Sequence, residues 1–147
     1  MPFPVSMKLE GLRAGQREEV LALLEVALHH AGARRLRGGS DRSTFTVPLH
    51  TTSALGLADS GRYSVQEYNE ASSKITVEVS YTRSAVALAV LLPVFFGIFA
   101  PGGIGDWNST EDIATFVLLV TIGFLWMHGG AYVISRFRVA RALGLEP

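Results

Sequence analysis

The sequence predicts a membrane protein in which a two-helix transmembrane hairpin fills the C-terminal half and a small α+β domain precedes it. Two apolar runs, 84–100 and 113–134, contain no Asp, Glu, Lys or Arg, and the short stretch 101–112 joins them. The first 82 residues instead mix charged, polar and apolar side chains in the alternating patterns of a folded domain. These observations together predict the fold class.

The elements of the N-terminal domain follow from hydrophobic periodicity. Apolar residues alternate with polar ones over 5–10, which predicts a first strand, and they recur at helical spacing over 15–31, which predicts a helix. Alternation returns over 44–49, 63–66 and 75–81, so three more strands are expected. The predicted order is β-α-β-β-β. The last two strands flank the polar stretch 69–73 and should pair antiparallel.

The two apolar runs differ in length. The first has 17 residues and the second has 22, which give helices of about 26 Å and about 33 Å at 1.5 Å per residue, against a hydrocarbon core of about 30 Å. The prediction is that both cross the bilayer, at about 84–100 and 113–134, with 101–112 as an outside loop.

Basic residues at the ends of the runs predict the orientation. Arg83 precedes the first run, Arg136, Arg138 and Arg141 follow the second, and 101–112 contains no Lys or Arg. The positive-inside rule then puts both termini in the cytoplasm, in a bacterial inner or intracytoplasmic membrane. The predicted parts are a cytoplasmic domain over 1–82, a hairpin over 83–136 and a cytoplasmic tail over 137–147.

Composition excludes several kinds of chemistry. The chain has no cysteine, so disulfides, thiol nucleophiles and cysteine-ligated metals are absent. No nucleophile–base pair, metal-ligand spacing or phosphate-binding glycine loop is recognisable, and the chain is therefore not expected to be an enzyme. Residues 1–83 hold ten basic and nine acidic residues, and without aromatic residues among the basic ones nucleic-acid binding is not expected.

His128 is the one side chain within either run that can change its charge near neutral pH. One interpretation is an axial ligand to a haem iron or a chlorophyll magnesium, since neutral imidazole suits both metals. The preferred interpretation is structural: a hydrogen bond to another helix, with no cofactor.

Two further sets of residues indicate contacts. Small residues let membrane helices approach closely, and the candidates for packing are Gly97, Gly123, Gly129 and Gly130. Basic residues near a membrane attract anionic lipid headgroups, and the candidates are Arg34, Arg35, Arg37, Arg83, Arg136 and Arg138.

These features favour a non-catalytic accessory or scaffold subunit of a larger membrane assembly, with other membrane subunits and anionic lipid as partners. One alternative is a cofactor-binding subunit of an electron-transfer or photosynthetic complex that uses His128. A second alternative is an enzyme that acts at the membrane surface.

Overall fold

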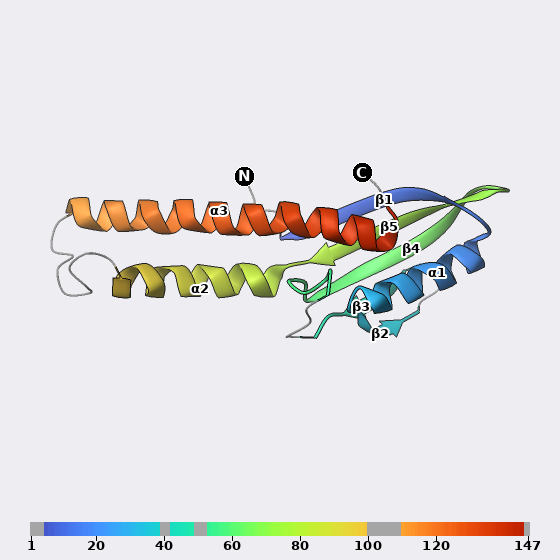
Figure 1. The fold of residues 1–147 in the computed structure, drawn as a ribbon, viewed down its shortest axis with the longest axis horizontal. Helices are drawn as coiled ribbons and strands as arrows, with labels where there is room; N and C mark the ends of the chain where they lie inside the picture. The colour runs from blue at the N-terminus through green and yellow to red at the C-terminus, as the bar shows by residue number, and fades with distance from the viewer. Residues whose placement is uncertain (1–4, 39–41, 49–52, 100–109, 146–147) are drawn as a thin grey trace. The chain divides into compact units, whose positions relative to one another are not determined.

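The computed structural model describes residues 5–38, 42–48, 53–99 and 110–145. The chain divides into two compact units (Figure 1). Unit 1 combines residues 1–83 with residues 134–147, and unit 2 is the stretch 84–133 between them.

Unit 1 is built on an antiparallel five-stranded sheet. Its elements in chain order are β1 (Ser6–Ala14), α1 (Arg17–His30), β2 (Arg34–Arg37), β3 (Ser43–Thr46), β4 (Ser60–Asn69) and β5 (Ser72–Ser80). The strand order is β1-β5-β4-β3-β2. The chain therefore leaves β1 at one edge, crosses through α1 to the other edge, and returns strand by strand until β5 pairs with β1.

The core of unit 1 lies on one face of the sheet. Alternate residues of the central strands point to this face, and the register aligns Leu9 with Val77 and Val77 with Tyr63. Helix α1 packs there through Val20, Leu24 and Leu28, whose spacing of four residues puts them on one side of the helix.

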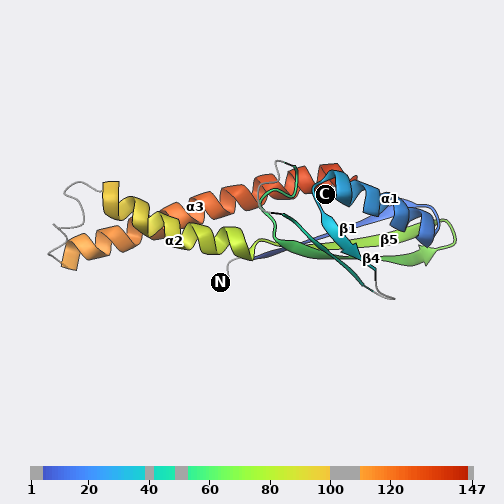
Figure 2. The same ribbon diagram turned by 90° about the horizontal axis from the view of Figure 1, so that it is seen from below.

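The C-terminal turns of α3 (Thr110–Leu143) cover the same face of the sheet as α1 (Figure 2). Val139, Ala140, Leu143 and Leu145 are buried, and a side chain on Gly11 of β1 would approach Leu145 to 2.6 Å. The segment 137–145, expected as part of a separate tail, therefore contributes these four residues to the hydrophobic core of unit 1.

Unit 2 contains α2 (Thr82–Phe99), apart from its first two residues, and the part of α3 up to Val133. Pro93 lies inside α2. The two helices meet near Gly123, where an added Cβ would lie 3.2 Å from the Phe96 ring and 3.8 Å from Leu92. Leu92 is buried at this contact.

The prediction of a two-helix transmembrane hairpin is wrong. Among the helices of the described residues, only α3, over Glu111–Leu143, is long and apolar enough to cross a membrane. The apolar part of α2 is Thr82–Ile98, about 26 Å long at 1.5 Å per residue and so shorter than the hydrocarbon core of about 30 Å. The second predicted span, 113–134, is the middle of a single 34-residue helix.

The predicted order β-α-β-β-β is also wrong, because it lacks one strand. The missing strand is β2, with the sequence Arg-Arg-Leu-Arg at the edge of the sheet. Three of its four side chains are exposed, so no alternation marks it, and Arg35 adopts a positive φ of 49°. The strands predicted over 44–49, 63–66 and 75–81 correspond to β3, β4 and β5, and β4 pairs with β5 antiparallel as expected.

Candidate functional site

The most unusual surface of the chain is the apolar exterior of unit 2. Its large hydrophobic side chains are mostly exposed, and Trp126 is exposed to 82%. They include Val86, Val90, Leu91, Val94, Phe95 and Ile98 on α2, and Ile113, Val117, Leu118, Leu119, Ile122, Leu125, Trp126, Met127 and Val133 on α3. Water-soluble monomers rarely expose an apolar surface of this extent, because hydrating it is unfavourable. This surface fits lipid or apolar partner helices.

The four glycines predicted to pack helices have different surroundings. Gly123 faces Phe96 and Leu92 inside unit 2, so its small size serves the contact between α2 and α3. Apart from their own helix, no atom of the described residues lies within 4 Å of a Cβ added to Gly129 or Gly130, which leaves their side of α3 open for a close approach within this part of the chain. Gly97 is partly exposed on α2.

His128 lies within unit 2 and not on its exterior. Its side chain is only 4% exposed, and its ring stacks on Phe124 one turn earlier, with centroids 5.4 Å apart and planes inclined by 16°. The ring is therefore buried against Phe124 within unit 2. Ligation of haem or chlorophyll by His128 stays a prediction.

The arginines predicted to contact lipid occupy three places. Arg34, Arg35 and Arg37 are exposed on the edge strand β2, where Arg34 Nη1 also donates to His29 Nε2. Arg136 and Arg138 are exposed on α3. Lipid contact by these five arginines stays a prediction.

Arg83 has protein partners. Its Nη2 donates to the carbonyl oxygens of Ala58, at 2.8 Å, and Val47, at 3.3 Å. Its backbone N–H donates to Asp59 Oδ2 at 3.3 Å, so this carboxylate accepts from the first turn of α2, where negative charge is favoured by the helix dipole. These bonds tie the start of α2 to the segment before β4. A lipid contact of Arg83 stays a prediction.

Sequence reasoning missed a buried hydrogen bond in unit 1. The Tyr81 hydroxyl and Ser135 Oγ lie 2.7 Å apart, and their residues are 3% and 4% exposed. They are separated by 54 positions, so only the fold brings them together. The bond joins the residue after β5 to α3. In the sequence, Tyr81 lies just before unit 2 and Ser135 lies just after it.

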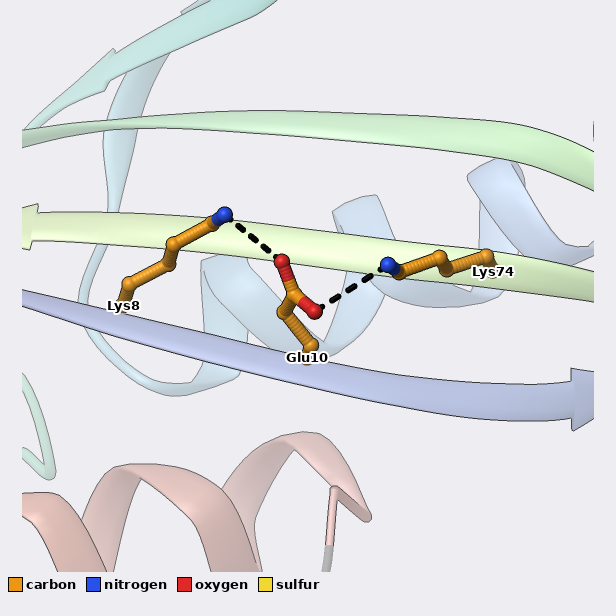
Figure 3. A network of polar contacts seen from close by, with 3 residues as sticks. All are labelled: Lys8, Glu10 and Lys74. Carbon is orange, nitrogen blue, oxygen red and sulfur yellow. Dashed lines mark ion pairs between the residues drawn. The ribbon is translucent and has the colours of Figure 1, made fainter.

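Sequence reasoning also missed a charged cluster on the face of the sheet opposite the core. Glu10 accepts from Lys8 at 2.6 Å and from Lys74 at 3.1 Å (Figure 3). The hydrogen bonds from Lys8 and Lys74 lower the pKa of Glu10, and the bond to Glu10 raises the pKa of Lys8. Alternation along β1 signals that residues 8 and 10 share a face, but only the pairing of β1 with β5 adds Lys74.

No group of three or more potential metal ligands occurs within the described ranges. No family model, curated protein or solved structure matches the chain. The functional argument therefore rests on the residues themselves.

Proposed function

We propose that the chain is a non-catalytic accessory or scaffold subunit of a larger membrane assembly. Unit 2 is held in the lipid of the membrane, and unit 1 is presented at the cytoplasmic surface. One observation carries this proposal: the large apolar side chains of unit 2 point outward, away from any core of their own.

Lipid alone accounts for part of this surface, and a partner accounts for the rest. The open side of α3 at Gly129 and Gly130 allows another helix to approach closely, and van der Waals packing at small residues drives helix association in membranes. The other membrane subunits expected as partners would pack on this side.

The orientation is part of the same proposal. Both ends of the chain belong to unit 1, as do Arg83, Arg136, Arg138 and Arg141. Under the positive-inside rule unit 1 therefore faces the cytoplasm. Anionic lipid of the inner leaflet is the expected partner of the exposed arginines, which gain about 1 kcal/mol each near such a surface.

The assembly is tested by placing a large side chain on the open side of α3. Gly130→Leu should reduce the size of the complex on native gels after extraction in mild detergent, because leucine prevents close approach while still entering lipid. The matched control is Ala114→Leu, sixteen residues earlier on nearly the opposite side of α3 and also exposed. An unchanged complex in Gly130→Leu, or an equal loss in both variants, contradicts the proposed packing side.

The orientation is tested by single cysteines, which the natural chain lacks. An impermeant thiol reagent should spare Glu67→Cys in β4 and Arg138→Cys in α3 in intact cells and should label both after the membrane is permeabilised; both positions are exposed and belong to unit 1. Labelling of both variants in intact cells contradicts the orientation.

A further inference from the structure

The face of the sheet opposite the core forms a shallow polar hollow. It has a volume of about 280 Å³ and lies over β1, β5 and β4. Ser64 and Thr76 are direct partners across β4 and β5, and Arg62 and Glu78 are partners in the next row on the same face. Arg42, just before β3, also lines the hollow.

Positive charge exceeds negative charge in this hollow. The basic side chains that line it are Lys8, Arg42, Arg62 and Lys74, and the acidic ones are Glu10 and Glu78. Four positive and two negative charges give the hollow a formal net charge of +2. The two lysines both donate to Glu10 (Figure 3).

The remaining donors are not engaged within the part of the chain that the structure describes. The Arg42 and Arg62 guanidinium groups there have no carboxylate within ion-pair distance. The hydroxyls of Ser64 and Thr76, which line the hollow, have no side-chain hydrogen bond among these residues. Among the described residues, two guanidinium groups and two hydroxyls therefore line one hollow without an ion pair or a side-chain hydrogen bond of their own.

We infer that this hollow binds a phosphate group. A phosphate monoester carries a charge of about −1.5 to −2 at neutral pH and three acceptor oxygens, which complements the excess of +2 and the free donors. Guanidinium groups bind phosphate oxygens in pairs, and hydroxyls can donate to the third oxygen. The phosphate is carried by a soluble phosphomonoester or by a phosphatidic acid headgroup, and both present the same dianion.

The inference is independent of the proposed role of unit 2, because every lining residue belongs to unit 1. A failure of phosphate binding leaves the membrane role intact, and a failure of the membrane role leaves the hollow intact.

The test uses the full chain in nanodiscs of phosphatidylcholine, with an environment-sensitive dye on Thr44→Cys. Thr44 is exposed and aligned with Arg62 on the neighbouring strand, so the dye reports on the hollow. Titration with inorganic phosphate at constant ionic strength should give a saturable signal that chloride does not give. A second set of nanodiscs includes phosphatidic acid: a signal with free phosphate identifies a soluble ligand, and a signal with phosphatidic acid alone identifies the headgroup.

Three variants should differ in their effect on the affinity for phosphate. Arg62→Gln should weaken binding about tenfold or more, because it removes a charge-assisted hydrogen bond. Glu78→Gln should tighten binding severalfold, because it removes a nearby negative charge. Arg13→Gln, on β1 outside the hollow, should leave binding unchanged.

Two results overturn the inference. One is the absence of a saturable signal from either source of phosphate. The other is an equal effect of Arg62→Gln and Arg13→Gln, which would mean that only the net charge of the chain matters.

Discussion

Replacing Tyr81 by phenylalanine tests whether the C-terminal turns of α3 are part of unit 1. The change removes only the hydroxyl that lies 2.7 Å from Ser135 Oγ. Ser135 is 4% exposed, so its hydroxyl cannot turn to water once its partner is gone. A buried polar group left without a partner costs about 1–3 kcal/mol.

This cost should appear as easier release of residues 136–145 from the sheet. Hydrogen exchange of their backbone amides, followed by mass spectrometry on the full chain in detergent, measures the free energy of that opening. Because 1.4 kcal/mol corresponds to a factor of ten, Tyr81→Phe should accelerate exchange in this segment by roughly five- to a hundredfold. Tyr68→Phe, on the exposed end of β4, is the control and should leave exchange unchanged.

A double-mutant cycle separates the hydrogen bond from other effects. Ser135→Ala alone should also accelerate exchange, and the pair Tyr81→Phe with Ser135→Ala should cost less than the sum of the single variants, since neither partner is then left unsatisfied. Additive effects, or unchanged exchange in Tyr81→Phe, would refute the reasoning that this bond holds α3 on the sheet.

Three more predictions concern unit 1. Gly61→Ala should lower the free energy of unfolding by about 1–3 kcal/mol in thermal or denaturant melts, because its Cβ would lie 2.5 Å from the carbonyl oxygen of Glu78. Burial raises the pKa of Tyr63 to about 12 from 10; the unfolded chain therefore ionises first, and about 2–3 kcal/mol of stability should be lost as the pH rises from 10 to 12. Tyr63→Phe should abolish this loss in alkaline melts. Lys8→Met should raise the pKa of Glu10 in an NMR titration, because one of the two lysines that lower it is gone.

The strands and α1 could be predicted because each one shows its burial in the local sequence. Val77 and Val79 alternate with polar residues, and Val20, Leu24 and Leu28 recur every four residues, so one pattern indicates a strand and the other a helix. Strand β2 has no such signal, because its arginines are exposed at the edge of the sheet.

The role of the C-terminal segment was harder to predict. The four-residue spacing of Val139 and Leu143 is a helical signal, but the segment follows the second apolar run and was therefore predicted only as a cytoplasmic tail. The error in α2 had a different origin, because a charge-free helix of about 26 Å was taken as long enough to cross a hydrocarbon core of about 30 Å.

The polar hollow could not be predicted from the sequence, since its lining is assembled by strand register. Alternation puts Lys8 and Glu10 on one face of β1, yet Arg62 and Lys74 join them only because β5 lies between β1 and β4. The open side of α3 was indicated by its glycines, although only the fold separates Gly123 from Gly130.

The central claim is that unit 2 lies in lipid, and Trp126 tests it directly. The chain has two tryptophans, so Trp107→Phe leaves Trp126 as the single fluorophore. Trp126 is 82% exposed on α3, and its surroundings therefore decide its emission. In vesicles, its fluorescence should be blue-shifted and strongly quenched by lipids brominated on their acyl chains. Red-shifted emission that acrylamide quenches and brominated lipids do not would contradict the claim.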